Sequence, residues 1–141
     1  MFKNIFNKNK KEDSDNKNIL VAALLIHAAK IDENYTDAEK RIIKQALMKL
    51  NNISSDQTMK LIKLAEKKEE ESNQMLEFTK EIKKYPMEFR LKIIEIMWKI
   101  VYSDDTSDNY ESNLIRRICG LLYISDKDNG IIKTKVKNLL K

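Results

Sequence analysis

Acidic residues gather in two short stretches of this 141-residue chain, and their spacing is suited to holding a metal ion. Each stretch places an aspartate seven residues before a glutamate, Asp32 before Glu39 and Asp104 before Glu111. Where one helix ends at the aspartate and the next begins near the glutamate, the loop between the helices brings the two carboxylates close together. We call each of these helix–loop–helix segments an acidic corner. Such oxygen donors suit hard cations, because Ca²⁺ takes six to eight oxygens and Mg²⁺ takes one or two carboxylates plus waters. The candidate metal ligands are Asp32, Glu33, Asp37, Glu39, Asp104, Asp105, Asp108 and Glu111.

The same residues also fit a purely structural role as helix caps. Residues 36–39, Thr-Asp-Ala-Glu, have the sequence of a capping box, and residues 108–111 can act in a similar way. Neither stretch is an EF-hand, because Asp37 and Asn109 stand where that loop requires glycine. Spacing alone favours caps over metal sites, and both interpretations stay open.

No arrangement of residues for catalysis is evident elsewhere. The single histidine, His27, excludes a His-rich metal centre, and the single cysteine, Cys119, excludes a disulfide framework. We expect His27 to be a core histidine bonded to a carbonyl, and Cys119 to be a small buried hydrophobe. The interleaved Lys and Glu of residues 66–71 are typical of a solvated helix face. We therefore predict that the chain is not an enzyme and has no small-molecule substrate.

Composition indicates an all-α fold. Only two glycines and one proline occur, too few for the turns of a β-sandwich or for a glycine-rich phosphate loop. The net charge of +5 is concentrated in lysines near the two ends of the chain, while the interior stretches are acidic, so we do not expect nucleic-acid binding. The uncharged run 19–29 is too short to span a bilayer.

Start and stop signals predict seven helices in one domain. Residues 1–18 are expected to be a flexible basic tail, and residues 19–141 a single helical domain. Helices 19–31 and 86–103 are apolar almost all round and should lie at the centre. The predicted helices cover residues 19–31, 36–50, 55–71, 73–84, 86–103, 108–123 and 125–140.

The two halves of the sequence repeat. Residues 29–43 match residues 101–115, so a buried helix, an acidic corner and an amphipathic helix recur 72 positions apart. We predict two helical hairpins related by a pseudo-two-fold axis, with the third and fourth helices bridging them.

Residues 28–39, the helix with Phe78 and Ile82, and residues 98–122 together resemble the TerB family of tellurite-resistance-type proteins, which is similar to the N-terminal domain of DnaJ-type membrane co-chaperones. The resemblance covers about residues 19–130. It implies an all-α bundle with two acidic loops that bind divalent metal. One departure is that Glu33 and Asp105 stand where the family usually has glycine.

The resemblance also implies a function: a non-enzymatic, bacterial stress-response module. We expect a divalent cation, Ca²⁺ or Mg²⁺ rather than Zn²⁺, at the two corners. We also expect protein partners, membrane-associated ones among them, and a cytoplasmic location, peripheral to the inner membrane. The alternative is a helical interaction adaptor, similar to a co-chaperone, whose acidic loops are only helix caps.

Overall fold

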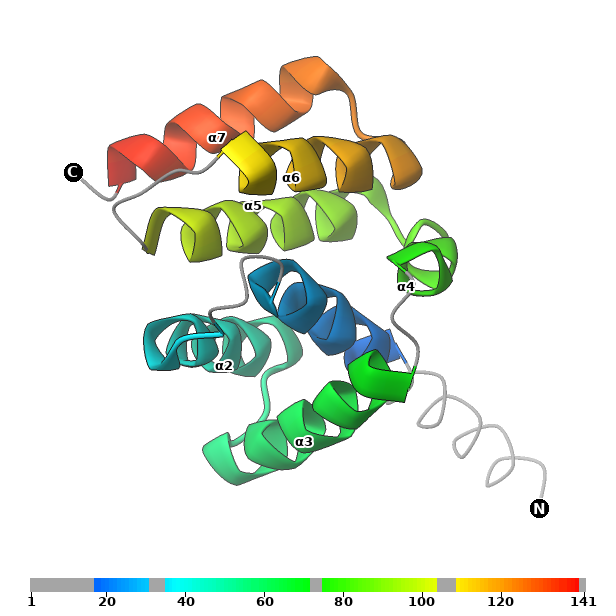
Figure 1. The fold of residues 1–141 in the computed structure, drawn as a ribbon, viewed down its shortest axis with the longest axis vertical. Coiled ribbons are helices and arrows are strands. Elements are labelled where there is room, and N and C mark those ends of the chain that lie inside the picture. The colour runs from blue at the N-terminus through cyan, green and yellow to red at the C-terminus, as the bar shows by residue number, and fades with distance from the viewer. Residues whose placement is uncertain (1–16, 31–34, 72–74, 104–108, 140–141) are drawn as a thin grey trace.

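The computed structural model describes residues 17–30, 35–71, 75–103 and 109–139, and its regular elements there are all helices (Figure 1). The first helix covers residues 17–29 and carries no label in Figure 1. Six helices follow it, as α2 (Asp37–Asn51), α3 (Ser55–Glu71), α4 (Met75–Ile82), α5 (Met87–Ser103), α6 (Asn109–Leu121) and α7 (Asp126–Leu139). The all-α prediction is confirmed.

Local signals fix where the helices begin. Ser54 and Gln57 form a reciprocal cap on α3, since the Gln57 amide donates to Ser54 Oγ and the Ser54 amide donates to Gln57 Oε1. Pro86 comes directly before α5, where the missing N–H of proline costs the helix nothing. The described first helix begins at residue 17, so Lys17 and Asn18 belong to the bundle and not to the predicted tail. The Lys17 ammonium lies over the rings of Tyr85 and Phe89, at 4.4 and 4.0 Å from their centroids.

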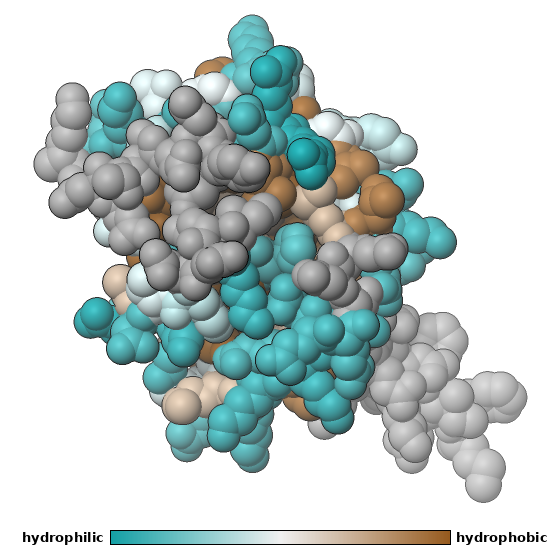
Figure 2. Space-filling model, viewed as in Figure 1, coloured by the Kyte–Doolittle hydropathy of each residue, from teal (hydrophilic) through white to brown (hydrophobic). Residues whose placement is uncertain are grey.

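The first helix and α5 form the centre of the molecule, as their all-round apolar sequences predict. In Figure 1 they lie between α6 and α7 on one side and α2 and α3 on the other. Residues 20–26 of the first helix are buried, and so is Trp98 of α5, which is 1% exposed. The Trp98 indole N–H donates to Asn129 Oδ1 at 2.9 Å and thereby joins α5 to α7. Among the described residues, the face seen in Figure 2 is mostly hydrophilic.

The internal repeat extends over three helices in each half. Asn52 and Tyr123, 71 positions apart, both have left-handed backbone, with φ of 52° and 58°. In both turns the next amide bonds back five residues, Ile53 N to Met48 O and Ile124 N to Cys119 O. A capping serine follows in each case, so α3 corresponds to α7. The prediction that the third and fourth helices bridge two hairpins is therefore wrong for α3, and only α4 stands between the halves.

Among the described residues, no helix combines the length and the apolar character that crossing a membrane requires.

Candidate functional site

The first acidic corner is a helix cap. Glu39 Oε1 accepts hydrogen bonds from the Thr36 amide at 3.3 Å and from the Thr36 hydroxyl at 3.0 Å. The Glu39 amide in turn donates to Thr36 Oγ1 at 3.1 Å. This reciprocal arrangement is the capping box that the sequence predicts. It buries the Glu39 side chain against the bundle, where only 2% of the residue is exposed.

The remaining predicted metal ligands fall mostly outside the part of the chain that the structure describes. Asp37 lies exposed in the first turn of α2. The position of Glu111 in α6 is described, but its side chain is not. Within the described residues, no group of three His, Cys, Asp or Glu side chains is placed to hold a metal ion. The metal-binding role of the corners therefore stays a prediction. The candidates outside the described residues are Asp32, Glu33, Asp104, Asp105 and Asp108.

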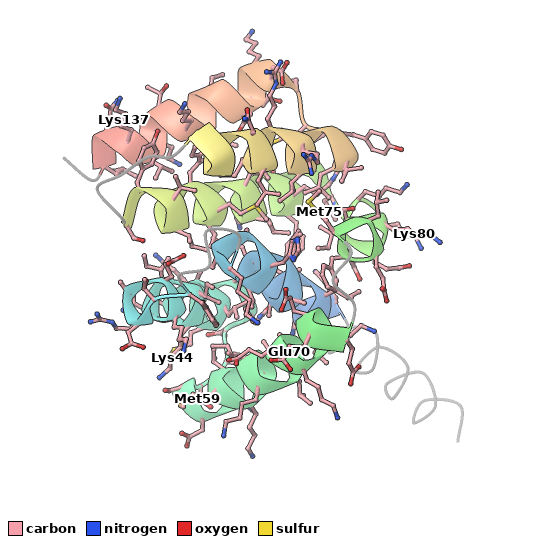
Figure 3. All side chains as sticks on the ribbon, in the orientation of Figure 1. Lys44, Met59, Glu70, Met75, Lys80 and Lys137 are labelled. Carbon is pink, nitrogen blue, oxygen red and sulfur yellow. The ribbon has the colours of Figure 1, made fainter. Side chains whose placement is uncertain are left out.

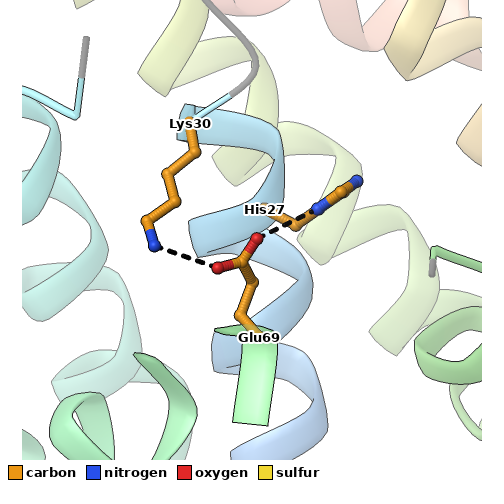
Figure 4. Close-up of polar contacts among 3 residues, drawn as sticks. All are labelled: His27, Lys30 and Glu69. Atoms are coloured by element: carbon orange, nitrogen blue, oxygen red, sulfur yellow. Dashed lines mark hydrogen bonds and ion pairs between the residues drawn. The ribbon is translucent and has the colours of Figure 1, made fainter. Parts of the chain in front are cut away.

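A buried carboxylate with two partners lies next to this corner (Figure 4). Glu69, in the last turn of α3, is 5% exposed. Its Oε2 accepts a hydrogen bond from Lys30 Nζ at 3.0 Å, and its Oε1 is 3.3 Å from His27 Nδ1. His27 lies in the last turn of the first helix and Lys30 directly follows that helix, so the contact joins the ends of two helices. Lys30 is the last described residue before the gap at 31–34, so the contact also lies beside the acidic corner.

The sequence analysis missed this contact in two ways. His27 meets a carboxylate and not the carbonyl that we expected, and Glu69 is buried although residues 66–71 were predicted to be a solvated face. A signal was present in the sequence. The buried side of α3 follows Leu61 and Ala65 at intervals of four, and the next position in that series is Glu69.

Tyr35 lies near both the capping box and the Glu69 contact. Burial raises the pKa of its phenol, and the nearby carboxylates of Glu66, Glu39 and Glu69, in that order of effect, raise it further. The phenol is therefore protonated and neutral at physiological pH. Among the described residues its buried hydroxyl finds no hydrogen-bond partner. The neutral phenol thus lies near three carboxylates, which among the described residues are not grouped to hold a metal ion.

Cys119 is buried in α6, as predicted. Burial, and then the charge of Asp126, raise the pKa of its thiol to about 12. The thiol is therefore protonated at neutral pH, and a protonated buried thiol is a poor nucleophile.

One of three comparisons with known proteins gives a match. A family model described as tellurite resistance protein TerB matches residues 18–134, which include both acidic corners. Searches of curated proteins and of solved structures returned no match. Because the matched region covers most of the sequence and the fold is helical throughout the described part, the chain belongs to the TerB family.

Proposed function

We propose that this chain is a non-enzymatic module of the tellurite-resistance and stress-response type, and that it binds a divalent cation at its acidic corners. The observation that carries the proposal is the recurrence of the corner. The family match spans two stretches in which a helix is followed by an aspartate and then, seven residues later, by a glutamate in the first turn of the next helix. A cap needs one acceptor per helix, whereas each stretch supplies four carboxylates.

The donor chemistry favours a hard cation. Every charged candidate ligand is a carboxylate, and carboxylate oxygens suit Ca²⁺ and Mg²⁺, whereas Zn²⁺ sites in proteins are built mainly with Cys and His. Glu33 and Asp105, which replace the family's usual glycines, add an oxygen donor to each corner. Family membership also supports a cytoplasmic role beside stress-response and membrane-associated protein partners.

Thermal unfolding with and without divalent cations tests the proposal. Millimolar Ca²⁺ or Mg²⁺ should raise the melting temperature by several degrees relative to EDTA, because a ligand that binds only the folded state stabilises it, by about 2.7 kcal/mol at one hundred times its Kd. The double substitution Asp32→Asn with Asp104→Asn should abolish the shift.

A matched control removes the same charge elsewhere. Asp56 and Asp126 lie in the first turns of α3 and α7, which are equivalent helices in the two halves and lie outside the corners. Asp56→Asn with Asp126→Asn should therefore keep the cation-dependent shift. If no divalent cation moves the melting curve of the wild type, the corners are caps only.

In that case the chain is an interaction adaptor, and one observation favours this second function. Several large apolar side chains are exposed on a small domain, among them Met59 at 49% and Leu64 at 54% on α3. Exposed apolar surface is typical of protein interaction sites where it is contiguous and has a polar rim. A protein partner that co-purifies with the chain in EDTA would distinguish an adaptor from a cation-dependent module.

A further inference from the structure

A groove between α2 and α3 combines an apolar base with a basic rim. Its volume is about 370 Å³, and eight residues line it. Figure 3 shows two of them, Lys44 on α2 and Met59 on α3. Met59 is half exposed and Ile62 partly buried, so apolar surface is accessible at the base. The rim carries four cationic side chains, Lys40, Arg41, Lys44 and Lys63.

The groove follows the antiparallel register of the two helices over two turns. Lining residues from α2 occupy positions 37–44 and those from α3 occupy positions 59–66. The lining residues nearest the turn at residues 52–54 are Lys44 on α2 and Met59 on α3, and those furthest from it are Asp37 and Glu66. The groove is therefore basic and apolar along most of its length and acidic at the end nearest the corner. Two turns correspond to about 11 Å of helix.

The cations on the rim have no ion-pair partner among the residues that the structure describes. Within the described part of the chain, none of the ion pairs includes Lys40, Arg41, Lys44 or Lys63. Lys40 lies over the Tyr35 ring, with its ammonium 4.8 Å from the centroid, which leaves its charge in place. A partner that carries carboxylates would supply the missing negative charge.

We propose that the α2–α3 groove docks an acidic amphipathic helix of a partner protein. An apolar side chain of that helix lies on Met59 and Ile62, and carboxylates three or four residues away face the basic rim, in the manner of helix-in-groove recognition. Met59 suits this role, since an unbranched thioether adapts its shape to a guest side chain. The proposal deepens the adaptor function and does not depend on cation binding at the corners.

The shape and charge of the groove favour a protein helix over a polyanionic surface. Asp37 and Glu66 close one end, and these carboxylates oppose an anionic lipid surface or a continuous phosphate backbone. A helix can orient its own cationic or polar end towards them. The apolar base is also recessed between two helices, where a single side chain reaches it more readily than a flat membrane does.

Binding of a defined peptide tests the proposal. The probe is a fluorescein-labelled, 14-residue helical peptide with two leucines four positions apart and glutamates flanking them on the same face, and its anisotropy is measured with the full chain. A peptide of the same composition, with the leucines on opposite faces, is the probe control. Lys44→Glu with Lys63→Glu should weaken binding of the first peptide at least tenfold, because two attractive charges become repulsive. Lys127→Glu with Lys137→Glu on α7 changes the charge equally and should leave binding unchanged.

A second measurement uses the wild type, so it does not depend on how a variant folds. With ¹³C-labelled methionine methyl groups, the peptide should shift the Met59 signal and leave that of Met97, which is 1% exposed, in place. Equal binding to wild type and Lys44→Glu/Lys63→Glu, or no binding to either, overturns the proposal. The proposal is also overturned if the chain binds anionic phosphatidylserine vesicles but not the peptide, and if Lys44→Glu/Lys63→Glu weakens that vesicle binding. If a protein partner co-purifies equally with the wild type and with Lys44→Glu/Lys63→Glu, the chain is an adaptor but the groove is not its binding site.

Discussion

Glu69 shows how this bundle accommodates a buried charge. Its position in the apolar series of α3 places the carboxylate inside, where an isolated negative charge would be costly. Lys30 offsets that cost with a hydrogen bond at 3.0 Å, and His27 contacts the second oxygen at 3.3 Å. The contact therefore fixes the end of α3 against the end of the first helix, next to the acidic corner.

Replacing Glu69 with glutamine tests this role. Glu69→Gln keeps the size of the side chain but removes the charge that Lys30 meets, so it should lower the free energy of unfolding by about 1.5–3 kcal/mol, the usual worth of a hydrogen bond to a charged group. Urea unfolding measures the change. The adjacent Glu70 is exposed, and Glu70→Gln should shift stability by less than about 0.5 kcal/mol. Equal stabilities for the two variants would mean that the Glu69 contact contributes nothing.

Residue-scale prediction succeeded for local contacts and failed for distant ones. The Thr36–Glu39 capping box was predictable because its partners are three positions apart and the motif has a defined spacing. The contacts of Glu69 span 39 and 42 positions, and nothing in the sequence pairs α3 with His27 or Lys30. What the sequence does contain is the four-residue interval from Ala65 to Glu69, which signals burial but not the partner.

At the scale of elements, helix ends were predicted to within about two residues because each has a local cause. The pyrrolidine of Pro86 sets the start of α5, and capping serines set the starts of α3 and α7. The role of α3 was harder to predict, because its match with α7 lies in the left-handed turns before the two helices and not in similar residues. Asn52 adopts that conformation readily, whereas Tyr123 gives no sequence signal for it.

The left-handed backbone at Tyr123 makes a prediction about the end of α6. A side chain with a Cβ is strained at φ 58°, and glycine is not. Tyr123→Gly should therefore stabilise the protein by about 0.5–1 kcal/mol in thermal or urea unfolding, because relief of the left-handed strain exceeds the entropy cost of glycine. This gain is expected even though the substitution removes the ring that lies 5.7 Å from the Lys83 ammonium. Tyr123→Ala removes the same ring and keeps the Cβ, so it should give no gain. If alanine and glycine stabilise equally, relief of backbone strain is not the cause.

At the scale of the whole molecule, the two halves share one hydrophobic core. Buried residues of the first helix, α2 and α3 form a single cluster with those of α5, α6 and α7. Helix α2 of the first half packs directly on α5 of the second half, and α4, which links the halves, packs on α6. Each half by itself would expose the apolar face of a central helix. The two repeats are therefore joined by one hydrophobic core and do not form two stacked domains.

This arrangement predicts a single unfolding transition. Trp98 is the only tryptophan, so its fluorescence reports on α5 and the second half, whereas far-UV circular dichroism reports on all the helices. The two urea curves should coincide in midpoint and slope, because loss of either half removes core contacts from the other.

Leu47→Ala provides a sharper version of the test, since Leu47 lies in α2 of the first half and is fully buried. Emptying that site should cost about 2–5 kcal/mol and move the Trp98 transition as far as the dichroism transition. A shift seen by dichroism alone would show that the first half unfolds separately, and that the shared core does not couple the two repeats.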